Sequence, residues 1–248
     1  MTSTGGVRRT ELELPDGRAL GIHDTGPDAG ASVVLWHGGS PNTGEPPAPW
    51  RDDGERWIGV DRPGYGRSTR LPGRRVADVT TDVGAVLDHL GIATCRTVGH
   101  SGGASHALAC AALLPDRVTA ALCLSGLSPG DPLEAPDTGD EIPFTPEDRA
   151  VLAGPWAWFE TVVAEASGSP GFDDDELAHA GDWGFDPAVT TVPVRIVHGE
   201  ADLVVPIGHA YRLARLLPAA ELVVVPGAGH LSVLEHLDAR GGLTRGAG

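Results

Sequence analysis

The 248-residue sequence contains no lysine, so all 18 of its basic residues are arginines. This absence excludes every mechanism that needs a catalytic amine. The chain also carries 34 acidic residues, and its formal net charge is therefore −16. Such a charge disfavours binding to nucleic acid or to an anionic membrane surface. We therefore expect a small molecule as the partner.

Long apolar runs and cysteines are scarce as well. No stretch approaches the roughly 18 consecutive apolar residues of a membrane-spanning helix, and residues 1–14 lack the apolar centre of a signal peptide. Cys95, Cys110 and Cys123 are odd in number and lie in separate apolar stretches. They are typical of reduced core residues rather than of a metal site or a disulfide framework. We expect a cytoplasmic protein with neither metal nor cofactor.

Short apolar segments alternate with helical patterns along most of the chain. The turn sequence Pro15-Asp16-Gly17-Arg18 predicts a hairpin formed by residues 7–14 and 19–24. Hydrophobic periodicity predicts further strands at 32–36, 57–60, 94–98, 118–124, 194–197 and 221–225, and helices at 76–90, 104–114, 207–217 and 231–240. The alternation predicts an α/β fold, in which a mostly parallel sheet is flanked by helices on both faces.

The alternation stops between Pro129 and Pro187. We therefore divide the chain into a core, residues 1–128 and 188–248, and an insertion, residues 129–187, with a helical piece at 147–165. The insertion holds 15 acidic residues and a single arginine. Its charge indicates either a solvated outer face or a surface that repels anionic substrates and favours neutral or cationic ones. Its aromatic residues are expected to pack mostly against the core: Trp156, Trp158, Phe159, Trp183 and Phe185.

A G-x-S-x-G pattern, Gly99-His100-Ser101-Gly102-Gly103, lies between a predicted strand and a predicted helix. A serine in a sharp turn of this kind has a strained backbone and an exposed hydroxyl. Glycine is needed on either side because a Cβ atom there would collide with the neighbouring strand or helix. Ser101 is therefore a candidate nucleophile.

A serine hydroxyl becomes a good nucleophile only when a base removes its proton and a third group orients that base. Functional side chains of an open parallel sheet gather beyond the carboxyl ends of its strands. Asp202 follows the strand at 194–197, and His230 follows the strand at 221–225. Glu200 and Asp186 are the alternatives to Asp202. The alternatives to His230 are His198, expected to shape its own loop, and His209 and His236, expected on solvated helix faces.

Taken together, these segments resemble the α/β-hydrolase family from about residue 7 to residue 237. The resemblance also rests on the loops at 37–41 (HGGSP) and 61–68 (DRPGYGRS). It implies that Ser101 is the nucleophile, that His230 is the general base and then the general acid, and that Asp202 orients His230. The backbone N–H of Gly102 would form one half of an oxyanion hole. Two alignments remain open for the other half, one giving Gly39 and the other Ser40.

The resemblance has further implications for the two remaining segments. It makes residues 129–187 the short cap that covers the active site in this family. We expect the loop at 61–68 to be structural, with Arg62 paired to a carboxylate.

The resemblance implies a serine hydrolase that cleaves a small ester, thioester, lactone or amide through an acyl-enzyme. Epoxide hydrolases and haloalkane dehalogenases have aspartate where this chain has Ser101, and hydroxynitrile lyases of this fold need a lysine. Other chemistries stay open: carbon–carbon bond hydrolysis, a lyase, cyclase or acyltransferase, and a catalytically silent binding protein. A proline-type aminopeptidase is a further option, although Ser40 interrupts the His-Gly-Gly-Pro run of that group.

Overall fold

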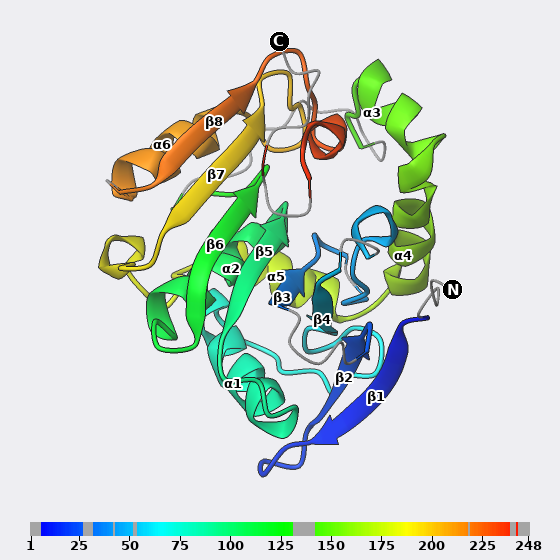
Figure 1. The fold of residues 1–248 in the computed structure, drawn as a ribbon, viewed down its shortest axis with the longest axis vertical. Coiled ribbons are helices and arrows are strands. Elements are labelled where there is room, and N and C mark those ends of the chain that lie inside the picture. The colour runs from blue at the N-terminus through cyan, green and yellow to red at the C-terminus, as the bar shows by residue number, and fades with distance from the viewer. Residues whose placement is uncertain are drawn as a thin grey trace.

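The computed structural model of the chain describes residues 6–26, 32–41, 43–51, 54–130, 142–217, 219–238 and 242. These residues contain one eight-stranded sheet with the order β1-β2-β4-β3-β5-β6-β7-β8 (Figure 1). Its strands are β1 (Arg8–Glu13), β2 (Ala19–Asp24), β3 (Val33–His37), β4 (Arg56–Val60), β5 (Cys95–His100), β6 (Val118–Leu124), β7 (Val194–Gly199) and β8 (Glu221–Val225). Strands β1 and β2 form the predicted hairpin, β2 pairs antiparallel with β4, and all remaining pairs are parallel. The predicted α/β class is confirmed.

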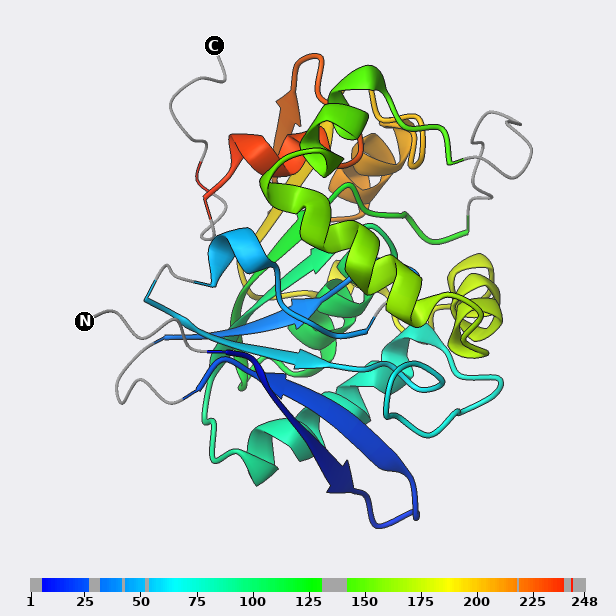
Figure 2. The ribbon, with the colours of Figure 1, turned by 90° about the vertical axis from the view of Figure 1, so that its right-hand side faces the viewer.

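Helices cover both faces of the sheet. The α-helices are α1 (Val79–His89), α2 (Gly102–Leu113), α3 (Pro146–Leu152), α4 (Trp158–Ala166), α5 (Gly171–Ala180) and α6 (Gly208–Leu216). Short 3₁₀ helices occur at Ala48–Trp50, Val76–Asp78, Pro155–Ala157, Pro187–Val189 and Ser232–His236. In Figure 2, α3 and α4 run one after the other across the front of the sheet. No helix in the described residues is long and apolar enough to cross a membrane.

Two hydrophobic clusters fill the space between the sheet and its helices. One contains Leu35, Leu87 and Leu108 and joins the sheet to α1, α2 and α6. The other contains Trp36, Trp57 and the 3₁₀ residue Leu234 on the opposite face. Every residue from Gly102 to Ala112 is buried, so α2 is enclosed on all sides, as its alanine-rich sequence allows.

The expectations for cysteines and aromatic residues are confirmed. The three cysteines are free and buried, and burial raises the pKa of Cys95 to about 11 and that of Cys123 to about 12. Trp156 and Trp183 are buried in the two clusters, while Trp158, Phe159 and Phe185 are partly buried against them.

Two details of the helix prediction are wrong. The helical piece at 147–165 is split between α3 and α4, because Gly154 and Pro155 interrupt the helical hydrogen bonds. The helix predicted at 231–240 is a 3₁₀ helix limited to Ser232–His236, and its end at 240 lies outside the described residues. Leu231, Leu234 and Leu237 recur every third residue, which matches three residues per 3₁₀ turn.

Helix α5 was not predicted, because its buried residues are largely polar. Asp174, Asp175 and His179 are buried, whereas Leu177 is 71% exposed. A helix with this pattern carries no apolar stripe for sequence analysis to detect.

The turn between β5 and α2 is packed as closely as the sequence predicts. A Cβ atom on Gly99 would overlap the carbonyl of Gly103, and a Cβ on Gly103 would overlap the carbonyl oxygens of His37 and Gly38. Because these obstacles are backbone atoms, no side-chain movement can relieve the overlap.

This packing predicts opposite effects for two glycine-to-alanine substitutions. Gly103→Ala is expected to reduce the free energy of unfolding by about 3 kcal/mol or more, since it overpacks a backbone contact. Gly84→Ala, in the middle of α1 where a Cβ meets no atom within 4 Å, is expected to raise it by about 1 kcal/mol. Urea denaturation of both variants measures the two changes. A Gly103→Ala variant as stable as the wild type would contradict the packing.

Candidate active site

Ser101 lies at the point where β5 passes into α2. Its backbone has φ 55° and ψ −130°, a conformation that non-glycine residues rarely adopt. The turn is held by two backbone hydrogen bonds, from Ser101 N to Leu124 O (2.9 Å) and from Ala104 N to Ser101 O (3.0 Å). The Ser101 side chain remains partly exposed. The strained turn therefore presents the hydroxyl at the carboxyl edge of the sheet, as the motif predicts.

Asp202 and His230 are in direct contact beyond the ends of β7 and β8. His230 Nδ1 lies 2.8 Å from Asp202 Oδ2. The other carboxylate oxygen, Oδ1, accepts hydrogen bonds from the backbone N–H groups of Val204 (2.9 Å) and Val205 (2.8 Å). Burial alone would raise the pKa of Asp202, but His230 and His198 beside it hold that pKa well below its ordinary value. The carboxylate is therefore ionised and fixed against the imidazole.

The loop that carries His230 is anchored by a buried carboxylate of α3. Asp148 accepts hydrogen bonds from the backbone N–H groups of His230 (3.1 Å), Leu231 (2.8 Å) and Ser232 (2.8 Å). A Cβ atom on Gly229 would overlap this carboxylate. Asp148 thus caps the start of the last 3₁₀ helix from outside the loop, as an N-cap side chain does.

No hydrogen bond joins Ser101 Oγ to His230 among the residues that the structure describes. The two residues are connected through their neighbours, because His100 Nε2 donates to the His230 carbonyl oxygen at 3.0 Å. The His100 and His230 rings lie 4.7 Å apart between centroids. Hydrogen bonds between a catalytic serine and its histidine are commonly long in free enzymes and shorten when substrate binds.

The loop after β3 lies against Ser101. Strands β3 and β5 pair with His37 opposite Gly99, so the chain after His37 passes directly beside the serine. A Cβ atom on Gly39 would lie 3.6 Å from Ser101 Oγ, and a Cβ on Gly102 would lie 3.0 Å from Ser40 Oγ. The structure therefore places Gly39 beside Ser101, and it places the Ser40 side chain beside Gly102, which follows Ser101 in the chain.

Comparisons with known proteins agree with this geometry. The sequence profile of the alpha/beta hydrolase fold family matches residues 29–171 and 150–237. The chain belongs to this family. It is therefore an enzyme of the hydrolase class, as the sequence predicts.

Individual relatives of this alpha/beta hydrolase differ in their named activities. The proposed carbamate hydrolase RutD of Caulobacter vibrioides is 28% identical over 249 residues, which cover 90% of this chain and 92% of that protein. The bifunctional esterase/perhydrolase DCH of Acinetobacter calcoaceticus is 28% identical, with coverage of 87% and 90%. The crystal structure of the enol-lactonase from Burkholderia xenovorans has a TM-score of 0.74 at 20% identity and covers 91% of this chain and 94% of that one.

The alternatives to Asp202 have other contacts in the hydrolase. Glu200 is exposed and accepts a hydrogen bond from Gly227 N at 3.3 Å. Asp186 caps the 3₁₀ helix at Pro187–Val189. Of these three carboxylates, Asp202 is the one that contacts His230.

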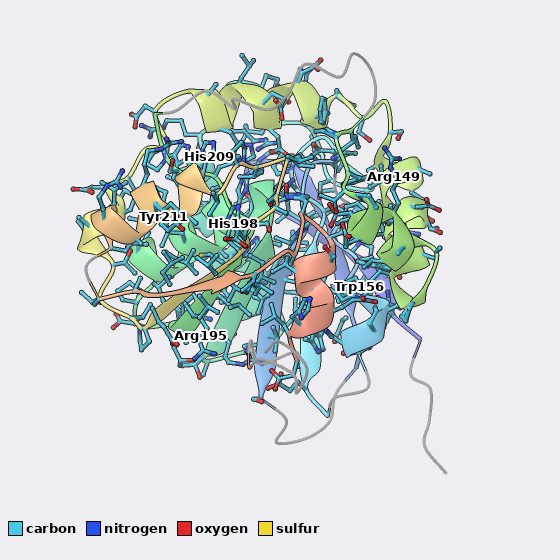
Figure 3. All side chains as sticks on the ribbon, turned by 90° about the horizontal axis from the view of Figure 1, so that it is seen from above. Arg149, Trp156, Arg195, His198, His209 and Tyr211 are labelled. Carbon is cyan, nitrogen blue, oxygen red and sulfur yellow. The ribbon has the colours of Figure 1, made fainter. Side chains whose placement is uncertain are left out.

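Two of the alternatives to His230 have further partners of their own. His198 Nε2 lies 2.7 Å from the carbonyl oxygen of Val205, so it shapes its loop as expected, and 3.4 Å from Asp202 Oδ2. The expectation of a solvated face is wrong for His209. This residue is only 1% exposed, and its Nδ1 accepts a hydrogen bond from the backbone N–H of Ser128. Figure 3 shows His198 and His209 toward the interior of the molecule and Arg149 at its periphery.

Two carboxylates and a histidine beside this region were missed by sequence analysis. Asp148 contacts the His230 loop, Asp175 contacts Arg62 and Ser40, and His179 contacts Gly102. All three lie in residues 129–187, which contain no motif of the family. Only the expectation that Arg62 pairs with a carboxylate pointed to one of them, and that expectation is confirmed.

Four buried histidines of this hydrolase stay neutral at mildly acidic pH. Burial lowers the pKa of His37 and His100 to about 3, that of His179 to about 4, and that of His106 well below its ordinary value. In the unfolded chain each histidine binds a proton below pH about 6.5. Between these values the unfolded state binds more protons, so stability falls as the pH falls.

We therefore expect the free energy of unfolding to decrease steadily from pH 6.5 towards pH 4. Each of these histidines contributes about 1.4 kcal/mol per pH unit in this window. Urea denaturation at pH 7.5, 6.5 and 5.5 measures the slope. A stability that is constant from pH 7.5 to 5.5 would contradict the assignment of four neutral buried histidines.

Proposed function

We propose that this protein is a serine hydrolase that cleaves a small ester, thioester, lactone or amide through an acyl-enzyme on Ser101. The observation that carries the proposal is the 2.8 Å contact between His230 Nδ1 and the ionised Asp202, beside a serine in a strained strand-to-helix turn. A carboxylate on Nδ1 keeps the proton there and leaves Nε2 free to act as a base. The esterase and lactonase names of the relatives favour the same substrate class.

The proposed reaction has two halves. His230 Nε2 takes the proton of Ser101 while Oγ attacks the substrate carbonyl carbon, and the resulting imidazolium is stabilised by Asp202. The tetrahedral intermediate places its negative oxygen near the N–H of Gly102 and the N–H of Gly39 or Ser40. His230 then protonates the leaving group, and a water molecule activated by the same base releases the acid. Oxyanion donors of this kind contribute about 3–4 kcal/mol each.

A fluorophosphonate probe tests the nucleophile without requiring knowledge of the substrate. We expect intact mass spectrometry to show one adduct on the wild type and none on Ser101→Ala. His230→Ala is expected to react at least about 100-fold more slowly, since general-base catalysis is lost. His236→Ala is the matched control and is expected to react at the wild-type rate. A folded wild-type protein that forms no adduct would contradict the proposal and favour a silent binding protein or a non-hydrolytic reaction.

The charge of residues 129–187 supports a preference within this substrate class. Seven of their acidic residues are exposed in the structure: Glu147, Glu160, Glu165, Asp173, Glu176, Asp182 and Asp186. We propose that these residues, as a cap over the site, favour neutral and cationic substrates over anionic ones.

Esters that match in size and differ in charge test this preference. At about 10 mM ionic strength we expect kcat/KM for a choline ester to exceed that for a succinate monoester at least about threefold. The ratio is expected to fall towards one at high salt, since screening shortens the range of the field. Equal kcat/KM values for both esters at low salt would contradict this preference and would indicate that the acidic residues only form a solvated outer face.

A further inference from the structure

A single guanidinium holds both candidate peptide groups of the oxyanion hole. Arg62 Nη1 donates to the carbonyl oxygen of Gly38 at 2.7 Å, and Arg62 Nη2 donates to that of Gly39 at 3.0 Å. In a planar trans peptide the C=O and the following N–H point in opposite directions. The N–H groups of Gly39 and Ser40 therefore both point away from Arg62. Gly39 itself lies beside Ser101, so the guanidinium sets the orientation of either donor.

Arg62 is in turn held by a carboxylate of α5. Arg62 Nη2 lies 2.6 Å from Asp175 Oδ2, and both side chains are buried. The same Oδ2 atom accepts hydrogen bonds from Ser40 Oγ (2.7 Å) and Tyr65 OH (2.9 Å). Arg74 Nη2 lies 2.6 Å from Asp175 Oδ1. Burial alone would raise the pKa of Asp175, but the two arginines keep it well below its ordinary value, so the carboxylate is ionised.

One helical turn further along, α5 also contacts Gly102, the other proposed donor of the oxyanion hole. His179 Nε2 donates to the carbonyl oxygen of Gly102 at 3.1 Å. A Cβ atom on Gly102 would lie 2.7 Å from His179 Cε1. Residues four apart share one helix face, so Asp175 and His179 meet the two sides of the proposed oxyanion hole together.

We propose that Asp175 is a positioning residue that, through Arg62, holds the Gly39 and Ser40 N–H groups towards Ser101, so that the oxyanion hole is complete only while α5 is docked. This inference rests on the proposed serine-hydrolase function and adds a residue to it. A buried ion pair of this kind contributes little net stability, because desolvation offsets the attraction. The directional hydrogen bonds of Arg62, however, fix the planes of two peptide groups. An oxyanion hole requires its N–H donors to be held in such a fixed orientation.

The same helix contains a matched control for Asp175. Asp174 is also a buried acid with an arginine partner, since its two carboxylate oxygens lie 2.8 and 3.0 Å from Arg70 Nε and Nη2. Arg70 is half-exposed, and within the described residues its side chain hydrogen-bonds to Asp174 and not to the loop after β3. Asp174→Asn therefore removes an ion pair from the same helix without releasing Arg62.

The experiment measures the rate of fluorophosphonate labelling of Ser101 as a function of pH. We expect Asp175→Asn to lower the plateau rate on the order of 10- to 100-fold, as the loss of an oxyanion donor does. The midpoint of the pH curve is expected to stay within about 0.3 units of the wild type, because His230 and Asp202 are untouched. Asp174→Asn is expected to keep both values. A general loosening of the fold would affect both variants and is monitored by thermal denaturation.

A second variant tests the inference independently of the folding of Asp175→Asn. Arg62→Lys keeps a positive charge beside Asp175, but one ammonium cannot span the two carbonyl oxygens, so the same fall in plateau is expected. The inference is overturned by a folded Asp175→Asn or Arg62→Lys variant that reacts within twofold of the wild type. It is equally overturned if Asp174→Asn loses as much rate as Asp175→Asn. A wild type that does not react at all would overturn the proposed function itself.

Discussion

The contact between the first turn of α2 and the end of β3 leaves no room for a Cβ atom, and the geometry of the site depends on it. Gly103 lies against the His37 and Gly38 carbonyls, and Gly99 lies against Gly103. This contact fixes the strained backbone of Ser101 and places Gly39 beside its hydroxyl. The strain at Ser101 persists because the surrounding backbone admits no alternative. Glycine at these positions is therefore a requirement of packing as much as of turn geometry.

The acidic residues at 129–187 divide into two groups with different physical roles. The exposed group contributes to the negative field of this part of the molecule. Asp148 and Asp175, by contrast, are fully buried, and each contacts a different loop of the candidate site. Asp148 accepts hydrogen bonds from backbone N–H groups of the His230 loop, whereas Asp175 contacts Arg62 and, in the loop after β3, Ser40. A count of charges along the sequence treats both groups alike, because burial is a tertiary property.

Ionised groups at these buried positions remain charged because each has several partners. An unpaired buried carboxylate would take up a proton, since burial penalises the charged form. Asp202, Asp148 and Asp175 each accept several hydrogen bonds, and the pKa of each lies below its ordinary value. Three of the four neutral histidines, His100, His106 and His179, interact electrostatically with one or more of these carboxylates, yet burial keeps their pKa values low. The site is thus surrounded by groups whose charge states are set by burial and by specific partners rather than by bulk pH.

The sequence by itself determined the sheet, the turn at Ser101 and the placement of Asp202 and His230 after β7 and β8. These features follow from local patterns, because strand periodicity, glycine spacing and the chain order of loops are all written along the chain. Tertiary structure alone decided the site contacts of Asp148, Asp175 and His179, which join residues 77 to 135 positions apart in the chain. It also decided that α5 buries Asp174 and Asp175 and exposes Leu177, a pattern opposite to that of an ordinary amphipathic helix. Such contacts depend on which faces meet after the sheet has formed, and no local sequence pattern records that.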